Sequence, residues 1–407
     1  MRKSGGAVIH MDCKKIEILA GGWDGQEIAG KRVFHQDIMD FLADLSAEIL
    51  QNTETADSRE SRAFAFWCRR KHLQSWKAMI HNEKRIGWGM IFHIAPSNIP
   101  MLFAYSMVFG LVSGNGNIIR ISARSVKETK SLCKVIDQVM QKKEYRHIYK
   151  QNLILTYEKE EDITRELSSV CDGRVLWGGD KTVNTMKTFK MHPGNPELAF
   201  SDRTSIAVLN ASWMEQLSED EWNILVGNFY NDTLLMDQNA CSSPRVVFWI
   251  GKDIRKVEEV KKKWWDCFYK AAKNYELTPW KVSRKYEEIC NEVMESDSFE
   301  KIECRENLLY LAELSEYPKH PEQYQGKFGC FYQYHIENVK EVCSCLGRKV
   351  QTILCAGIKT EDFAEEIIQS GAKGGDRLVP VGQALELDPV WDGRNVLRTL
   401  SREITVM

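Results

Sequence analysis

The chain has 407 residues, of which 43% are hydrophobic and 28% are charged, an ordinary composition for a globular protein. Its length exceeds what one compact core usually holds and therefore predicts two domains. The formal charge of −2 leaves no overall basic field, which argues against a nucleic-acid partner. The longest apolar run, 99–112, falls short of the ~20 residues that a bilayer span needs.

Twelve cysteines are scattered along the chain and do not have the spacing of a disulfide framework. The first ten residues include two basic side chains but no long apolar stretch of the kind found in signal peptides. We therefore expect free thiols in a reducing cytoplasm. The closest pair, Cys343 and Cys345, has no histidine pair at zinc-site spacing beside it, so no metal site is expected.

The first half of the chain alternates between predicted strands and helices. Apolar periodicity predicts strands at 7–11, 16–19, 88–95, 117–121, 152–156, 174–177 and 205–209, and helices at 35–51, 59–81, 100–112, 125–140, 161–170 and 180–189. Such alternation is typical of a parallel, doubly wound α/β sheet, which binds nucleotides at the carboxyl ends of its strands. The usual Gly-x-Gly-x-x-Gly fingerprint is absent, and the glycine turns 114–116 and 178–179 are each a weak signal.

Two of these helices have recognisable starts. Pro100 suits the first turn of the helix that runs to 112, because its fixed backbone angle is already helical. Ser125 is expected to cap the helix that follows it, with Glu128 in the reciprocal position of a capping box.

A cysteine-containing loop separates a helix-like run at 212–235 from an apolar strand at 245–250. Cys241 has small neighbours in this loop, and Pro244 closes the loop just before the strand. Such a loop can hold a sulfur rigidly and exposed, the setting that a catalytic thiolate with a lowered pKa needs. An ordinary loop cysteine is the alternative.

The remainder of the chain continues the alternation. We expect a helix carrying a solvated lysine run at 261–263, a helix at 278–296, a mixed region up to 347, a strand at 350–355, a helix at 361–370 and a final apolar strand at 404–407.

Several stretches together carry a family resemblance. They are 93–100, 113–120, 177–180, 237–244 and 376–384 with 391–393. In this order they resemble the acyl-CoA reductases of the LuxC type, the reductase component of bacterial fatty-acid reductase, within the aldehyde dehydrogenase superfamily. The resemblance implies an aldehyde dehydrogenase-like α/β fold, with a Rossmann-type NADP-binding domain at 1–210 and a catalytic domain at 211–375. Residues 376–407 would return to the cofactor domain or to an oligomer interface.

The resemblance also implies a reaction. Cys241 would accept an acyl group from a thioester, either acyl-CoA or an acylated carrier or synthetase, and hydride from NADPH would then release an aldehyde. Hydride attack puts negative charge on the thioester oxygen, which needs donors already aimed at it. Asn98 matches the superfamily's oxyanion-stabilising asparagine, and the Cys241 backbone N–H would be the second donor. A turn or capping role before Pro100 is the alternative for Asn98.

The cofactor contacts likewise follow from the resemblance. It assigns them to Ala95, Pro96, Ser97, Arg120, Ser122, Gly178 and Gly179. Arg120 falls where the superfamily places a lysine at the adenosine ribose, and Ser122 matches a serine two residues later. Ala123 stands where NAD-preferring relatives often carry a glutamate, so a cation without a neighbouring carboxylate favours the 2′-phosphate of NADPH. A strand-end arginine facing solvent and an ordinary helix-start turn at 178–179 are the simpler interpretations.

One position departs from the superfamily pattern. Relatives that oxidise aldehydes use a glutamate to activate water, and Ala199 stands at that position here. Without this base the acyl-enzyme survives for hydride or another thiol, which favours a reductase. Glu197 is close by in the sequence, so NAD(P)-dependent aldehyde oxidation with Glu197 as base is the alternative.

A third hypothesis belongs to a different class. The chain would be a non-catalytic or acyl-carrying subunit that docks an acyl-activating, LuxE-like synthetase, because LuxC-type reductases work with such a partner. A homo-oligomer is also expected, since the tails of superfamily members commonly pair with a neighbouring subunit and the final strand is apolar. The sequence identifies neither the acyl chain nor its donor.

Overall fold

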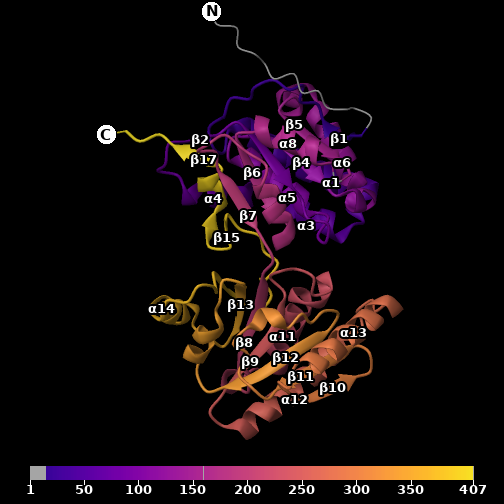
Figure 1. The fold of residues 1–407 in the computed structure, drawn as a ribbon, viewed down its shortest axis with the longest axis vertical. Coiled ribbons are helices and arrows are strands. Elements are labelled where there is room, and N and C mark those ends of the chain that lie inside the picture. The colour runs from indigo at the N-terminus through magenta and orange to yellow at the C-terminus, as the bar shows by residue number, and fades with distance from the viewer. Residues whose placement is uncertain (1–14, 159, 407) are drawn as a thin grey trace, which may run out of the picture. The chain divides into compact units, whose positions relative to one another are not determined.

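The computed structural model describes residues 15–158 and 160–406, and the strand predicted at 7–11 lies outside them. The chain forms two compact units (Figure 1). The first unit runs up to Ser201 and resumes at Arg394, and the second unit spans Asp202–Gly393. The chain therefore passes between the units twice.

The first unit contains a six-stranded sheet in the order β1-β5-β4-β3-β6-β7. Its strands are β1 (Glu17–Gly21), β3 (Met90–Ile94), β4 (Gly116–Ile121), β5 (Asn152–Thr156), β6 (Gly173–Trp177) and β7 (Glu197–Phe200). All pairs are parallel except the edge pair β1–β5. From β3 the chain proceeds through β4 and β5 on one side and then crosses to β6 and β7 on the other. The topological switch point of this doubly wound sheet thus lies between β3 and β6.

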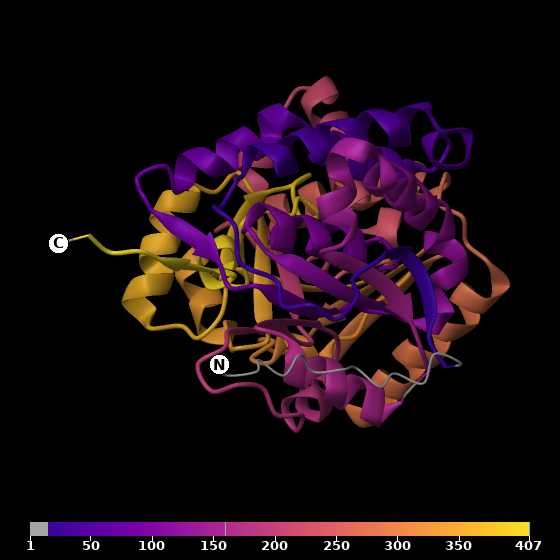
Figure 2. The ribbon, with the colours of Figure 1, turned by 90° about the horizontal axis from the view of Figure 1, so that it is seen from above.

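Helices cover both faces of this sheet. They are α1 (Gln36–Gln51), α2 (Thr53–Ala56), α3 (Arg59–Trp67), α4 (Arg70–Met79), α5 (Leu102–Val112), α6 (Val126–Gln141), α7 (Arg146–Tyr149), α8 (Glu161–Val170) and α9 (Asp180–Lys187), with 3₁₀ turns η1 (Ala123–Ser125) and η2 (Lys143–Tyr145). Alternate residues of β3 point to opposite faces: Phe92 packs with the α8 residue Leu167, and His93 contacts Ser106 of α5. The indigo helices of residues 36–79 run along one side of the sheet (Figure 2). The single helix predicted at 59–81 is two helices, because Arg69 is extended.

The segment from Arg394 completes the first unit. It contains β16 (Arg394–Asn395), α15 (Val396–Thr399) and β17 (Ser401–Glu403), and β17 pairs antiparallel with β2 (Arg85–Gly87) (Figure 1). The Arg85 guanidinium binds the Ser401 hydroxyl at 2.8 Å and the Arg398 carbonyl at 2.8 Å. The final strand therefore lies at 401–403 and not at the predicted 404–407. The reason is that the buried Ser401, and not the apolar tail, is held by Arg85.

The second unit contains a seven-stranded sheet in the order β10-β11-β12-β9-β8-β13-β14. Its elements are β8 (Thr204–Asn210), α10 (Ala211–Met214), α11 (Glu219–Asp232), η3 (Leu234–Met236), β9 (Pro244–Ile250), α12 (Ile254–Ala272), α13 (Pro279–Glu295), β10 (Phe299–Arg305), β11 (Leu309–Leu314), η4 (Pro321–Gln323), β12 (Cys330–Ile336), η5 (Val339–Cys345), β13 (Val350–Ala356), α14 (Thr360–Ser370), β14 (Arg377–Pro380) and β15 (Val390–Trp391). Only the edge pair β10–β11 is antiparallel.

The predicted domain limits at 210 and 375 move to 201 and 393. Strand β8, which the prediction gave to the first domain, pairs with β9 and β13 in the second unit. Strand β14 pairs with β13, so the first part of the predicted C-terminal segment also belongs to the second unit. The strand pairing decides both limits, because a central strand cannot leave its sheet without losing its ladder of hydrogen bonds.

Apolar side chains pack on both faces of the second sheet. Trp249 packs with the α12 residues Trp264 and Trp265 on one face, and Phe248 packs with Ile289 of α13 on the other. Within the predicted solvated lysine run, Lys261 is in fact buried, because Glu258 and Glu313 each accept a 2.8 Å hydrogen bond from its amine. Across the described residues, no helix has the length and hydropathy that a membrane crossing requires.

Candidate active site

The predicted cofactor-binding residues gather at the carboxyl edge of the first sheet. Ala95, Pro96 and Ser97 follow β3, together with Asn98, which lies on the exposed part of the loop. Arg120 and Ser122 stand at the end of β4, and 178–179 follow β6. The Ala95 N–H donates to the Arg120 carbonyl at 3.0 Å, which joins the first two loops. The structure thus brings these residues to the edge where doubly wound sheets bind nucleotides.

Ser125 has a different role from the predicted one. It occupies the N-cap of α6, but its side chain makes no capping hydrogen bond. The Ser125 hydroxyl instead donates to the Ser97 carbonyl at 3.4 Å. The capping box with Glu128 is therefore absent, because the hydroxyl ties the loop after β3 to the start of α6.

Arg120 has one buried donor atom without an acceptor in the described chain. Its Nη2 donates to the Tyr157 carbonyl at 3.2 Å, and its guanidinium lies 4.8 Å from the centre of the Tyr157 ring. Its Nε is buried and has no hydrogen-bond acceptor among the described residues. A buried guanidinium N–H without an acceptor fits an anionic oxygen of a bound ligand, such as a dinucleotide phosphate.

The glycine turn and the strand before it frame the same edge. Gly179 is the N-cap of helix α9, so no side chain caps the start of this helix. A Cβ added at Gly178 would come within 3.3 Å of the Thr182 side chain. The Trp177 ring stacks on Phe200 at 4.0 Å, and its indole N–H donates to Ser106. The backbone at this turn is therefore free of side-chain bulk, as close approach of a cofactor requires.

The neighbouring β7 offers no hydrolytic base at Ala199. Its methyl group packs against the apolar core of the first unit. Glu197 stands at the opposite, amino end of β7, where Arg174 binds its carboxylate through both Nε, at 3.0 Å, and Nη2. The Glu197 carboxylate is thus held in an ion pair, away from the carboxyl edge of this sheet.

The loop that carries Cys241 belongs to the second unit and is held from several sides. Asp237 and Gln238 both have left-handed backbone angles. The Asp237 carboxylate accepts hydrogen bonds from Tyr275 at 2.6 Å and Lys281 at 2.8 Å. The buried Gln238 amide donates to the carbonyls of Pro244 and Cys330, both at 3.2 Å, and accepts from the Gly329 N–H at 2.7 Å. These contacts fix the path of the backbone on both sides of the cysteine.

Cys241 is partly exposed and sits beside the amino ends of β8 and β9. The Ser205 hydroxyl of β8 donates to the Cys241 carbonyl at 2.7 Å. The Ser243 hydroxyl donates to the Asp232 carbonyl at the end of α11, also at 2.7 Å. The loop is therefore anchored to the strand beside it and to the helix before it.

The environment of the Cys241 thiol raises its pKa to about 11. Burial is the largest cause, and the Asp392 carboxylate adds to it. The Arg245 guanidinium, the Gln351 amide and the cysteine's own N–H act in the opposite direction. The pKa of the thiol is thus raised and not lowered, because desolvation of the sulfur outweighs its donors.

Arg245 is a buried cation beside this thiol. Its guanidinium donates to the Gly326 carbonyl at 3.2 Å and to the Thr204 hydroxyl and the Gln238 carbonyl, both at 3.3 Å. Its hydrogen-bond acceptors are neutral, and the carboxylates of Glu288 and Asp202 act on it only from beyond ion-pair distance.

Asp392 supplies the opposing charge. It is buried, has a left-handed backbone, and its carboxylate lies 3.9 Å from Nε of Arg203. Arg203 also pairs with Asp376 at 3.1 Å. The Trp391-Asp392-Gly393 motif is thereby held within the second unit, with a negative charge near Cys241.

A family model agrees with this arrangement. The model of the acyl-CoA reductase family, LuxC, matches residues 62–298, which is more than half of the chain. The chain belongs to the LuxC acyl-CoA reductase family. The matched region includes every candidate residue from Ala95 to Cys241.

Solved structures share the fold of this LuxC-family chain. Aldehyde dehydrogenase 21 from Physcomitrella patens, in complex with succinate, matches with a TM-score of 0.63 and 12% identity over 90% of this chain and 85% of its own. A lactaldehyde dehydrogenase matches with a TM-score of 0.64 and 12% identity over 91% of this chain and 86% of its own. An NAD-dependent aldehyde dehydrogenase from Sinorhizobium meliloti matches with a TM-score of 0.64 and 10% identity over 91% of this chain and 81% of its own. At such identities the likeness concerns the aldehyde dehydrogenase fold alone. A search of the curated proteins finds no match.

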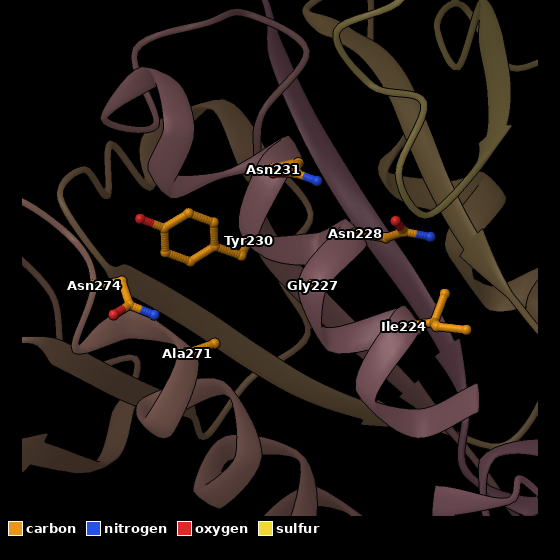
Figure 3. Close-up of a pocket in the computed structure, with 7 residues that line it drawn as sticks. All are labelled: Ile224, Gly227, Asn228, Tyr230, Asn231, Ala271 and Asn274. Atoms are coloured by element: carbon orange, nitrogen blue, oxygen red, sulfur yellow. The ribbon is translucent and has the colours of Figure 1, made fainter. Parts of the chain in front are cut away.

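A separate hollow lies on the second unit of this LuxC-family chain. It has a volume of about 450 Å³ and lies between α11 and α12 (Figure 3). The residues that line it are Ile224, Gly227, Asn228, Tyr230, Asn231, Ala271 and Asn274. These side chains include no carboxylate, amine, imidazole or thiol, and the Tyr230 hydroxyl is their one group that could act as a nucleophile or base. Within the described part of the chain, no group of three or more potential ligands is arranged to hold a metal ion.

Sequence reasoning missed three residues around Cys241. Ser205 and Gln351 stand at the beginnings of β8 and β13, and Arg245 is the second residue of β9. Each is a polar residue near the start of an otherwise apolar strand, and this pattern is the signal that was available. Their convergence on one cysteine depends on the order of the strands in the sheet, which the sequence does not reveal.

Proposed function

We propose that the chain reduces an acyl thioester to an aldehyde with NADPH, through an acyl group carried on Cys241. Membership of the acyl-CoA reductase family supports the reaction class. The observation that carries the proposal is the setting of Cys241, a partly exposed residue in an anchored loop whose thiol has Arg245 and Gln351 beside it. The ion-paired Glu197 and the apolar Ala199 support reduction over oxidation to an acid.

The first half of the proposed reaction is acyl transfer. The Cys241 thiolate attacks the carbonyl carbon of the thioester, the bond from that carbon to the donor sulfur breaks, and the departing thiolate takes a proton. Arg245 lowers the cost of forming the attacking thiolate, because its buried positive charge favours the ionised sulfur. The anchored loop keeps the sulfur in place during the exchange.

The second half releases the aldehyde. NADPH, when bound, supplies the hydride that the acyl carbon accepts. The carbonyl oxygen then carries a negative charge, for which the Cys241 N–H is a donor within the second unit. The role of the Asn98 amide as a further donor stays a prediction from the sequence. The carbon–sulfur bond breaks as the carbonyl reforms, and the Cys241 sulfur leaves as a thiolate that regains a proton.

The chain's own residues would hold the cofactor at the carboxyl edge of the first sheet. Arg120 would bind the 2′-phosphate with its unused Nε–H, and the turn at 178–179 would let the backbone approach the pyrophosphate. Ser122 and the loop 95–97 would line the same edge. The preference for NADPH over NADH, the synthetase partner, the homo-oligomer and the cytoplasmic location all stay predictions from the sequence.

The test uses acyl-CoA labelled in its acyl group. The full chain should retain label after denaturation, Cys241→Ala should retain none, and the matched variant Cys304→Ala, which alters an exposed cysteine, should label normally. Added NADPH should then discharge the label as aldehyde. Label that persists in Cys241→Ala contradicts the proposal. Release of labelled acid indicates an aldehyde dehydrogenase or hydrolase instead, and label that is insensitive to NADPH indicates an acyl-carrying subunit.

A further inference from the structure

The side chain of Gln351 is unusual for a strand interior. Gln351 is fully buried on β13, and neither its Oε1 nor its Nε2 has a hydrogen-bond partner among the described residues. Burial of an amide without partners is strongly unfavourable, and an apolar side chain of similar size would avoid the cost. A buried amide of this kind therefore calls for an explanation other than packing.

The position of Gln351 relates it to the nucleophile. The Ser205 hydroxyl donates to the Cys241 carbonyl at 2.7 Å and accepts from the Thr352 N–H at 3.2 Å. One hydroxyl thus joins the backbone of Cys241 to the start of β13. Successive side chains of a strand point to opposite faces, so Gln351 and Thr352 face different surroundings. Of these two, Gln351 lies beside the Cys241 sulfur, where its amide favours the ionised form.

We propose that Gln351 is a catalytic residue whose side-chain amide donates a hydrogen bond to the Cys241 sulfur when that sulfur is a thiolate. The assignment rests on the proposed role of Cys241 as the nucleophile. The thiol proton leaves to solvent, and the Gln351 Nε2–H then supplies a donor to the bare sulfur. A donor held in place and waiting for charge to form is the arrangement that lowers the barrier to a charged species.

The other charged groups around the sulfur leave this role open. Arg245 and Arg377 are the cations that interact with Cys241, and Asp392 is the anion. Arg245 donates to two carbonyls and a hydroxyl, and Arg377 donates to backbone carbonyls that include Ala384 at 2.9 Å. Their N–H groups are largely engaged, whereas the amide of Gln351 has no competing acceptor in the described chain.

The experiment measures the reactivity of Cys241 in the full chain as a function of pH. Iodoacetamide is the probe, and mass spectrometry of the Cys241 peptide separates this thiol from the others. Gln351→Met should slow alkylation about tenfold at a fixed, mildly alkaline pH and move the profile to higher pH. Gln351→Glu should slow it further, because a carboxylate repels the thiolate.

Thr352→Val is the matched control. Thr352 is the next residue of the same strand, is fully buried, and also has a side-chain oxygen without a partner among the described residues. Its removal should leave the pH profile of Cys241 alkylation unchanged. A profile of Gln351→Met that coincides with that of the unmodified chain overturns the proposal.

Stability separates a catalytic role from a structural one. Gln351→Met should raise the Tm, because it removes an unsatisfied buried amide, while it lowers thiol reactivity. A lower Tm with an unchanged pH profile indicates a structural glutamine and overturns the proposal. If Gln351→Met does not fold, Gln351→Asn replaces it. Asparagine keeps the amide but draws it back from the sulfur, so alkylation should slow and an unchanged profile overturns the proposal.

The assay also separates this inference from the proposed function, because alkylation requires no thioester. Slower alkylation in Gln351→Met, with no acyl adduct formed by the unmodified chain, supports the role of Gln351 and contradicts the reductase. An acyl adduct together with unaltered alkylation in Gln351→Met supports the reductase and contradicts the role of Gln351.

Discussion

The two sheets use opposite ends of their strands. In the first unit the candidate residues follow β3, β4 and β6 at the carboxyl edge. In the second unit Cys241 precedes β9, while Ser205 and Gln351 stand at the beginnings of β8 and β13. Both sheets are mainly parallel, so the two units share an architecture and differ in which end of the strands carries the candidate residues.

The two edges differ in what the backbone offers an anion. In a β–α–β unit, helices begin near the carboxyl edge of the sheet and end near its amino edge. Helix N-termini present free N–H groups and favour negative charge, whereas C-termini present carbonyls and do not. The first edge can therefore hold phosphates with little side-chain help. A thiolate at the second edge would depend on side-chain donors, and Arg245 and Gln351 are the donors that we propose for it.

Loss of Arg245 should give the largest effect. In Arg245→Met the carbonyls of Gly326 and Gln238 lose a buried donor, so the free energy of unfolding should fall by about 3 kcal/mol. Cys241 alkylation near about pH 8 should also slow about tenfold, because the cation that lowers the thiol pKa is gone. Urea unfolding and peptide-resolved mass spectrometry measure the two effects. Unaltered alkylation would show that the thiolate does not depend on this side chain.

The two units should respond to acid in opposite directions. Burial lowers the pKa of His93 from 6.5 to about 4, so its contribution to stability is complete above pH 6.5 and is lost as pH falls through 4. Burial raises the pKa of Asp232 from 3.8 to about 6, so its contribution is complete below pH 3.8 and is lost as pH rises through 6. Each effect amounts to roughly 3 kcal/mol.

Hydrogen exchange, corrected for intrinsic rates, measures the opening free energy of each unit over this pH range. His93→Asn should flatten the slope of the first unit alone, and Asp232→Asn that of the second unit alone. If the opening free energy changes with pH equally in a variant and in the unmodified chain, the substituted residue does not cause the pH dependence of its unit.

The carboxyl edge is tested by Arg120→Gln. Loss of the guanidinium should raise the Kd for NADPH about tenfold, equivalent to about 1.4 kcal/mol, whereas the Kd for NADH should change little. Arg124→Gln, which alters an exposed arginine on the neighbouring turn η1, is the control. Fluorescence titration with both dinucleotides is the measurement. An equal loss for the two cofactors would contradict a phosphate contact at Arg120.

The smallest effect is expected from Asp392→Asn. The Asp392 carboxylate raises the pKa of Cys241, so its neutralisation should lower that pKa and speed alkylation about threefold. Arg203 keeps Asp376 as a partner at 3.1 Å, so the fold should persist. Asp376→Asn is the control, because this carboxylate is not among the groups that raise the thiol pKa. Slower alkylation in Asp392→Asn would reverse the assigned sign.

The sequence predicted most of the first sheet because its central strands are buried on both faces and therefore apolar throughout. It did not predict β10, an edge strand that exposes Glu300 and Lys301 and so lacks a continuous apolar run. The small-residue loop made Cys241 a candidate, and the family resemblance added the role of nucleophile, which stays a prediction. The sequence could not identify Gln351, because the contact depends on β13 lying next to β8.

The segment from Arg394 has a consequence for the order in which the protein matures. The Arg85 guanidinium and the Asn115 amide bind carbonyls at Arg398 and Leu400, both at 2.8 Å. A ribosome translates the whole second unit before it reaches these acceptors. The second unit is one continuous segment of the chain, so it can fold from a single stretch. The first unit is assembled from two separate segments, so it is complete only when the strand from Ser401 has paired with β2.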